Sequence, residues 1–211
     1  MRVLVFGDSI TWGYSDSRGG WVDRLRGDFF GKDIKAKDQY SEPLIFNLGI
    51  GGDTLEEIIK RFEAETKARR WENLPLGFVI AIGVNDSRLE NGIARSTIEE
   101  YRQQLEHLLR LIKNESVLFV GLTPVVDGHP HVSEGDTIWQ NSRIKKFDDE
   151  LRSFCQTHGV GFVPIWEDFF GKEKELLDDG LHPNDAGHAL IAKLVKPHIK
   201  QLNKLGPPGS G

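Results

Sequence analysis

The chain has 211 residues and a formal net charge of −5, from 27 basic and 32 acidic side chains. This length fits one domain with a sizeable hydrophobic core, and the acidic balance argues against a nucleic-acid partner. The single cysteine, Cys155, excludes an internal disulfide. The apolar run at 3–6 is too short for a membrane span or a secretory signal, so we expect a cytoplasmic protein without membrane insertion.

Five apolar runs along the chain have the composition of buried parallel strands. They are rich in valine, isoleucine and phenylalanine and are largely apolar on both faces. They occupy residues 2–6, 44–48, 77–82, 116–122 and 160–165. Helical patterns separate them: one helix starts by about Trp21, and later apolar stripes begin at Leu55, Ile98, Ile144 and Ile191. This alternation predicts a single α/β domain over residues 1–203, a three-layer sandwich with a five-stranded parallel sheet.

Three smaller features complete this picture. The basic run at 67–70 is expected to end a helix, where cations complement the helix dipole. Cys155 lies on the apolar side of the helical pattern at 143–155, which indicates a buried small hydrophobe rather than a nucleophile. Residues 204–211 have no apolar periodicity and are expected to form a flexible tail, a candidate cloning remnant.

The segments that follow the strands are the places to look for a site. In open α/β sheets, ligands bind beyond the carboxyl ends of the strands. These segments are GDSITWG, GIGGDT, GVNDS, TPVVDGHPH and WEDFF. Most of them begin with glycine, aspartate, asparagine, serine or threonine, so polar chemistry is concentrated at this predicted edge.

Several familiar motifs fail in this sequence. GIGGDT at 49–54 breaks the G-x-G-x-x-G pattern at its last position, and GDFFGK at 27–32 is one residue short of a P-loop. Neither a G-x-S-x-G elbow nor a pair of zinc-binding cysteines occurs. His129 and His131 form an H-x-H beside Asp127, which we interpret as a polar surface turn rather than a metal site.

A serine, a histidine and an aspartate fall at positions that suit nucleophilic catalysis. Ser9 follows the first strand, and Asp179 precedes His182 by three residues in DDGLHP. A serine nucleophile needs a base to take its proton and a third group to orient that base. Gly52 and Asn85 follow other strands and could donate hydrogen bonds to a developing oxyanion. Each residue alone also fits an ordinary turn or helix cap, so their shared placement at one edge carries the hypothesis.

Four blocks of the sequence together resemble the signature blocks of the SGNH (GDSL) hydrolase superfamily. They are GDSITWG, NLGIGGDT, GVND and DDGLHP, and they run in this order from residue 7 to residue 183. The resemblance implies a flavodoxin-like α/β/α fold and a hydrolase that uses no metal and no organic cofactor. It implies that Ser9 is the nucleophile, His182 the base and Asp179 its orienting partner. The oxyanion hole would consist of the Ser9 and Gly52 backbone N–H groups and the Asn85 side chain.

The fold does not select a substrate within this superfamily, which includes esterases, thioesterases, lysophospholipases and carbohydrate deacetylases. Side chains expected to line the site are Trp12, Tyr14, Arg88 and His129. This mixture of aromatic and polar groups, without a long apolar lid, favours a small-molecule ester with a short acyl group, such as acetyl, on a polar alcohol. The alternatives are a thioesterase or lysophospholipase acting on longer acyl chains, and a non-catalytic module that binds a small ligand.

Overall fold

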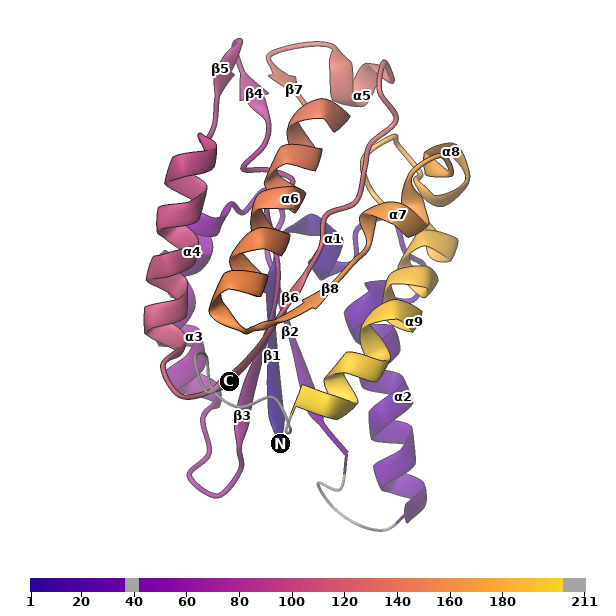
Figure 1. Ribbon diagram of the computed structural model, residues 1–211. Coiled ribbons are helices and arrows are strands. Elements are labelled where there is room, and N and C mark those ends of the chain that lie inside the picture. Colours follow the sequence, from indigo (N-terminus) through magenta and orange to yellow (C-terminus); the bar gives the residue numbers. More distant parts are fainter. Residues whose placement is uncertain (37–41, 203–211) are drawn as a thin grey trace.

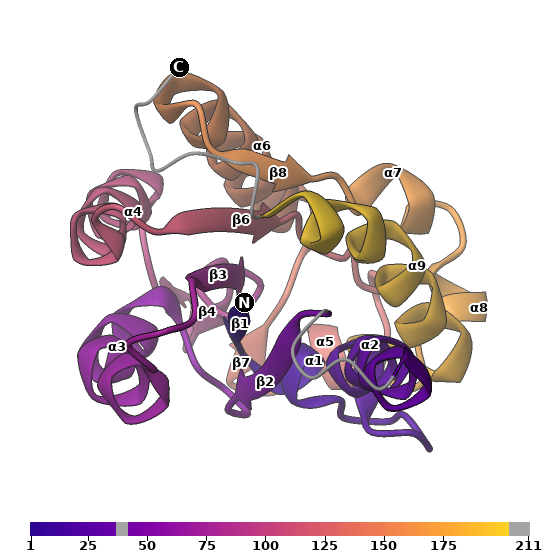
Figure 2. The same ribbon diagram turned by 90° about the horizontal axis from the view of Figure 1, so that it is seen from below.

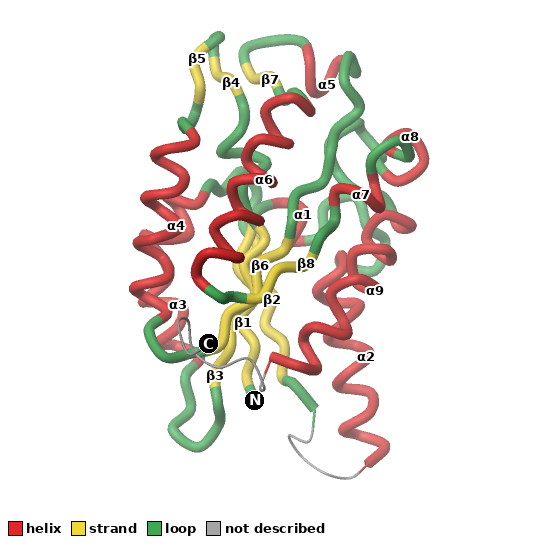
Figure 3. The backbone as a smooth tube through the Cα atoms, viewed as in Figure 1, coloured by secondary structure: helices red, strands yellow, loops and turns green. Residues whose placement is uncertain are grey.

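The computed structural model describes residues 1–36 and 42–202, and a parallel β-sheet forms its centre (Figures 1 and 3). Within those residues the sheet has five strands in the order β2-β1-β3-β6-β8. They are β1 (Arg2–Gly7), β2 (Leu44–Gly49), β3 (Leu76–Ala81), β6 (Ser116–Val120) and β8 (Gly161–Val163). When these five strands are renumbered 1 to 5 in chain order, their order in the sheet is 2-1-3-4-5, as in flavodoxin-like folds. The predicted α/β fold with a five-stranded parallel sheet is confirmed.

Helices cover both faces of the sheet, as Figure 2 shows. One face carries α2 (Gly20–Ala36) and α9 (Asp185–Gln201), and the other carries α3 (Leu55–Arg69), α4 (Ile98–Ile112) and α6 (Asn141–His158). Alternate residues of β1 serve the two faces: Val3 and Val5 pack with α2 and α9, whereas Leu4 and Phe6 pack on the opposite side. From Val3 to Phe6 the strand is apolar because both of its faces are buried.

Short helices follow the carboxyl ends of the strands or precede the last long helix. They are α1 (Ser9–Trp12), α5 (Pro130–Ser133), α7 (Trp166–Phe169) and α8 (Glu173–Leu176). All four lie in the upper half of Figure 1, beyond the sheet. This end of the sheet therefore holds the irregular segments from which a site can be assembled.

A second, antiparallel sheet at the same end was not predicted. It consists of β4 (Leu89–Glu90), β5 (Ile93–Ala94) and β7 (Thr137–Ile138), in the order β5-β4-β7. Each strand contributes two residues, which are too few for an alternating pattern to be recognised in the sequence. Because β4 pairs with β7, the segment after β3 is tied to the segment after β6.

The smaller predictions can be followed in the same structure. Cys155 is buried, and burial raises the pKa of its thiol, as a small core hydrophobe requires. Helix α3 ends at Arg69 with Lys67 and Arg69 in its last turn, as predicted. No helix within the described ranges is both long and apolar enough to cross a membrane. The tail predicted at 204–211 and the last residue of the predicted domain, at 203, lie outside the described residues.

Candidate active site

Ser9 lies at the carboxyl end of β1, in the first position of α1. Asp8 caps this short helix, because its carboxylate accepts a hydrogen bond of 2.9 Å from the backbone N–H of Ile10. Gly7 permits the close approach of the helix to the strand, since a Cβ atom there would lie 2.0 Å from the hydroxyl oxygen of Thr11. This turn leaves Ser9 partly exposed beyond the sheet, where a ligand can reach it.

A tight turn ahead of α9 brings His182 back to Ser9. Asp179 organises the turn: its Oδ1 atom accepts hydrogen bonds from the backbone N–H groups of Leu181, at 3.0 Å, and His182, at 2.8 Å. Gly180 has a φ of +84°, and a Cβ atom there would lie 2.7 Å from the Cγ atom of His129. The D-x-x-H spacing with this glycine therefore folds the carboxylate back onto the imidazole of the same segment.

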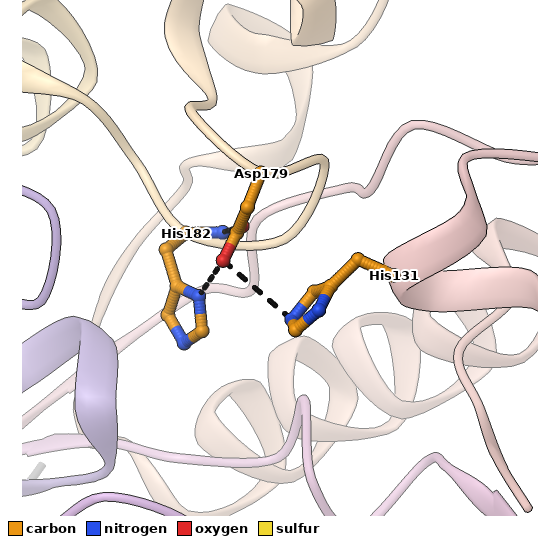
Figure 4. A group of neighbouring side chains, drawn as sticks. All are labelled: His131, Asp179 and His182. Carbon is orange, nitrogen blue, oxygen red and sulfur yellow. Dashed lines mark hydrogen bonds and ion pairs between the residues drawn. The ribbon is translucent and has the colours of Figure 1, made fainter. Parts of the chain in front are cut away.

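Ser9, His182 and Asp179 form a continuous set of hydrogen bonds, called here the Ser–His–Asp array. The distance from Ser9 Oγ to His182 Nε2 is 3.0 Å, although the two residues are 173 positions apart. The distance from His182 Nδ1 to Asp179 Oδ2 is 2.7 Å (Figure 4). A carboxylate only accepts hydrogen bonds, so Nδ1 carries the ring proton. His182 Nε2 is then the acceptor for the Ser9 hydroxyl.

Asp179 is kept in its charged form by the groups around it. Partial burial pushes its pKa upward, but this effect is outweighed by hydrogen bonds from the His182 backbone, the His182 ring and the Leu181 backbone. The net pKa lies below the ordinary value of 3.8. An ionised carboxylate at neutral pH holds the proton on His182 Nδ1 and stabilises a positive charge on the ring.

The loops after β2 and β3 meet beside Ser9. A Cβ atom on Gly51 would lie 3.9 Å from the Cβ atom of Ser9, so the first of these loops lies against the serine, and the exposed Gly52 follows. Asn85 is buried, and its Nδ2 atom donates a hydrogen bond of 3.0 Å to the carbonyl of Asp53. An amide nitrogen carries two N–H groups, so the second can serve a ligand.

Arg61 of α3 fixes the loop after β2, a role that the sequence did not indicate. Its guanidinium donates hydrogen bonds to the Asp53 carboxylate, at 2.9 Å, and to the carbonyls of Leu48, at 2.8 Å, and Gly7, at 3.3 Å. One cation thus joins the ends of β1 and β2 to the residue that holds Asn85. No short motif links positions 53 and 61, so pattern reasoning had no signal for this contact.

Two of the four predicted lining residues lie beside the array. The ring centroids of Tyr14 and His182 are 4.4 Å apart, and Trp12 lies 6.3 Å from Tyr14. Both aromatic rings are about half exposed. His188 of α9 anchors this segment, because its Nε2–H donates to the Tyr14 carbonyl at 3.0 Å while its Nδ1 accepts from the Trp21 backbone at 3.2 Å. Burial lowers the pKa of His188, which favours this neutral form.

The other two predicted lining residues, Arg88 and His129, make different contacts. Arg88 forms an ion pair with Glu90, and within the described ranges none of its hydrogen bonds or ion pairs reaches the Ser–His–Asp array. The ring of His129 packs on the Gly180 turn and accepts a hydrogen bond of 3.3 Å from the backbone N–H of His131. It is His131, two residues on, whose Nε2 atom lies 3.5 Å from Asp179 Oδ2. Its side chain is exposed as predicted, although His131 lies in the short helix α5 and not in a turn.

Two further carboxyl groups are buried below the site. Burial raises the pKa of both Asp8 and Asp86 to about 7. Asp86 Oδ1 accepts a hydrogen bond of 3.0 Å from the backbone N–H of Leu55 at the start of α3, and neither aspartate side chain is more than slightly exposed. Both groups therefore keep their proton in the folded protein at pH values where an exposed aspartate has lost it.

Replacing Asp86 with asparagine is expected to flatten the pH dependence of stability between pH 4.5 and 7. The folded-state pKa of Asp86, about 7, lies above the ordinary 3.8, so the folded protein binds the extra proton in this window. The contribution of protonated Asp86 to the free energy of unfolding is fully present below about pH 4 and is lost as pH rises toward 7. Asparagine removes a slope that approaches ~1.4 kcal/mol per pH unit. Urea unfolding at several pH values measures this slope of stability against pH. A slope in Asp86→Asn that equals those of the wild type and of the exposed-site control Asp149→Asn would contradict the prediction.

Comparison with known proteins identifies the family. Residues 5–190 match the model of the GDSL-like lipase/acylhydrolase family. The chain is 23% identical over 202 residues to thioesterase 1/protease 1/lysophospholipase L1 of Escherichia coli (strain K12), covering 95% of this chain and 84% of that protein. The solved lipase/acylhydrolase from Enterococcus faecalis is 26% identical, with a TM-score of 0.75 and coverage of 98% and 97%. An acetyl xylan esterase from Geobacillus stearothermophilus, 20% identical, shares the fold with a TM-score of 0.69 over 94% of each chain.

The family match covers most of the chain and includes Ser9, Asn85, Asp179 and His182 within its limits. The resemblance stated from the four sequence blocks is confirmed by this match and by the Enterococcus structure. The chain belongs to the GDSL-like lipase/acylhydrolase family and is a hydrolase.

Proposed function

We propose that this hydrolase cleaves carboxylic esters by nucleophilic catalysis, with Ser9 as the nucleophile. The observation that carries the proposal is the Ser–His–Asp array. Its two hydrogen bonds, of 3.0 and 2.7 Å, connect a hydroxyl, an imidazole and a carboxylate in the order that the chemistry requires.

The reaction proceeds in two halves. His182 Nε2 accepts the Ser9 proton as Ser9 Oγ attacks the acyl carbonyl, and the resulting imidazolium gives that proton to the departing alcohol. A water molecule then attacks the acyl-enzyme, and His182 again accepts and returns a proton. Asp179 stays ionised throughout and stabilises the positive charge that His182 carries in between.

The negative charge on the carbonyl oxygen would be stabilised by three donors. These are the backbone N–H groups of Ser9 and Gly52 and the second N–H of the Asn85 amide. Asn85 is well suited to this role because Asp53 fixes its side chain, and Arg61 in turn fixes Asp53. Donors that are already oriented need no rearrangement when the charge develops.

Asn85→Ala is expected to lower kcat by about 10²–10³-fold with little change in KM, because the lost hydrogen bond forms mainly in the transition state. Steady-state hydrolysis of p-nitrophenyl acetate measures both constants. Asn85→Leu, which is close in size and has no N–H or O–H to donate, should lose a similar amount. Asn114→Ala, at an exposed position after α4, is the matched control. A kcat within threefold of wild type in both Asn85 variants would remove Asn85 from the oxyanion hole.

The alcohol part of the substrate is proposed to be polar. A groove of about 830 Å³ has both Trp12 and Tyr14 in its wall; its polar members include Asp23, Arg26 and Asn47, and apolar residues 43–46 line another part. Tyr14 also contacts His182, so the groove adjoins the Ser–His–Asp array. Exposed aromatic faces beside groups that form hydrogen bonds suit a hydroxyl-rich partner such as a carbohydrate. The acetyl xylan esterase among the structural neighbours acts on a substrate of this kind.

The acyl part is proposed to be short. The cavity behind α1, which Asp8, Ile10 and Trp21 help to line, has a volume of about 30 Å³. On the same measure one water molecule needs about 10–15 Å³, so this space takes no more than a short acyl group such as acetyl. The competing function is a thioesterase or lysophospholipase, activities named for the Escherichia coli relative.

A series of p-nitrophenyl esters from acetate to palmitate separates these functions. Added methylenes do not improve the binding free energy of an ester in a shallow pocket. In a tunnel, each buried methylene improves the binding free energy by up to ~0.8 kcal/mol. We expect kcat/KM to be highest for acetate or butyrate and to fall with longer chains. A maximum at long chains would move the proposal to thioesters or lysophospholipids.

A module that binds a small ligand without cleaving it is the non-enzymatic alternative from the sequence. Covalent labelling by a serine-directed phosphonate tests it, because reaction needs a serine activated by its base. We expect labelling of one serine, identified as Ser9 by mass spectrometry. Unlabelled protein under these conditions would favour the binding module over the esterase.

A further inference from the structure

His131 extends the Ser–His–Asp array at its Asp179 end. It lies in α5, and its ring faces the same carboxylate oxygen that His182 contacts (Figure 4). One ligand atom from each of His131, Asp179 and His182 lies within 4.8 Å of the others. The three come from two separate segments, so the cluster depends on the fold and not on one local motif.

We propose that this cluster binds Zn²⁺ and that the bound ion inhibits the enzyme. The ligands are His131 Nε2, Asp179 Oδ2 and His182 Nδ1. Two imidazoles and one carboxylate form a familiar zinc donor set, with a fourth position left for water. The inhibitory part rests on the proposed function, whereas the binding part stands on the cluster alone.

Two of the three donor pairs are spaced nearly as in a zinc site, and the two histidine nitrogens lie within 4.8 Å of each other. Ligands about 2.0–2.2 Å from a tetrahedral ion are roughly 3.3–3.5 Å from one another. His131 Nε2 and Asp179 Oδ2 already lie 3.5 Å apart. The 2.7 Å between Asp179 Oδ2 and His182 Nδ1 must open by roughly 0.6 Å, which a small rotation of the ring achieves.

The surroundings of His131 hold it in place and leave it accessible. Its ring stacks on Trp139, with centroids 6.4 Å apart and an angle of 14° between the planes, and its backbone N–H donates to His129. Its side chain is 47% exposed, so an ion can reach it from solvent. At 3.5 Å its Nε2–H makes at most a weak hydrogen bond to Asp179, so little is lost when Nδ1 carries the ring proton instead and the Nε2 lone pair binds a metal.

Zinc at this position would disable His182 through its tautomer. Without metal, His182 Nδ1 carries the proton and Nε2 accepts from Ser9. When a Zn–Nδ1 bond forms, the Nδ1 proton leaves, and solvent delivers a proton to Nε2, so the ring remains neutral. The N–H then points at Ser9 Oγ and cannot accept its proton. Loss of the Nδ1 proton also removes the hydrogen bond from His182 Nδ1 to Asp179 Oδ2.

Titration of ZnCl₂ into metal-free full-length protein tests the inference by calorimetry and by inhibition of p-nitrophenyl acetate hydrolysis. We expect one ion per chain, with inhibition reversed by a chelator. His131→Ala and His131→Gln should bind zinc at least about 10-fold more weakly, as loss of one ligand predicts. Each should need about 10-fold more zinc for half-inhibition of its own zinc-free rate. His107→Ala, an exposed histidine of α4, is the matched control and should behave as wild type.

Two results would overturn the inference. The first is no zinc binding by the wild type, or equal binding by the wild type and both His131 variants. The second is tight binding without inhibition, which would exclude His182 as a ligand. Failure of the proposed function would be seen differently, because the Ser9→Ala variant would then retain hydrolysis. This variant keeps all three zinc ligands, so calorimetry on it tests zinc binding independently of the proposed function.

Discussion

Replacing Ser9 with alanine is expected to lower kcat by on the order of 10⁶-fold, the loss seen when the serine of a protease triad is removed. The reason is chemical, because alanine has no oxygen to form the acyl-enzyme, and His182 is left without a proton to accept. The oxyanion donors and the substrate contacts remain, so a weak residual activity above the uncatalysed rate should persist. Burst and steady-state hydrolysis of p-nitrophenyl acetate measure both the acylation and the turnover that are lost.

The Ser9 prediction can be separated from a general loss of structure. The N-terminal contacts of α1 use the Ser9 carbonyl, which accepts hydrogen bonds from the backbone N–H groups of Gly13 and Tyr14 and is unchanged by the substitution. The variant should therefore unfold at nearly the wild-type urea concentration. Ser153→Ala, at an exposed position of α6, controls for serine removal and should keep full activity. A folded Ser9→Ala protein with more than a few per cent of wild-type kcat would exclude Ser9 as the nucleophile.

The main sheet could be predicted because each of its strands is buried on both faces. Stretches such as 3–6 and 78–82 are apolar without interruption, as strands of a parallel sheet covered on both faces are. The predicted ends differ from the observed ones mainly at the carboxyl side: the runs at 116–122 and 160–165 extend beyond β6 and β8. Among the extra residues, Leu122 and Ile165 are apolar because they are buried in the core, although they lie beyond the paired strands. Hydrophobicity therefore reports burial, whereas the ladder hydrogen bonds decide where a strand ends.

The segments of the site could be predicted from topology. Residues that follow parallel strands meet at one edge whatever their separation in sequence, and this is why Ser9 and His182 lie 3.0 Å apart across 173 positions. Within DDGLHP, the three-residue offset selected Asp179 over Asp178, and its carboxylate contacts the His182 ring at 2.7 Å. Local spacing was enough here because a single turn sets the distance.

The supporting contacts could not be predicted, for a physical reason. Arg61, His131 and His188 act through side chains whose direction depends on the packing of α3, α5 and α9. Each is a polar residue in a helix, and the same residue types on a solvated face leave the same sequence pattern. His129 and His131 illustrate the limit: one packs on the Gly180 turn and the other faces Asp179, although they are two residues apart.

Asp179→Asn is expected to lower kcat by about 10⁴-fold, the second-largest effect proposed for this enzyme. The asparagine Oδ1 can still accept the backbone hydrogen bonds of Leu181 and His182, so the turn should survive. Its amide nitrogen, however, takes the place of Oδ2 and donates toward His182 Nδ1. The ring then carries its proton on Nε2, facing Ser9, and cannot act as a base. The loss should appear in kcat rather than KM.

Asp178→Asn is the matched control, because it changes the same residue type one position earlier on an exposed side chain. It should retain wild-type kcat. The two variants should also differ in acid. The folded-state pKa of Asp179 lies below 3.8, so its charge contributes stability above about pH 4 that is lost as pH falls through the folded-state value. Asp179→Asn should lose stability at pH 7 and respond less to acid than either other protein. Equal kcat values for the two variants would show that His182 is oriented without Asp179, and the array would then be a serine–histidine pair.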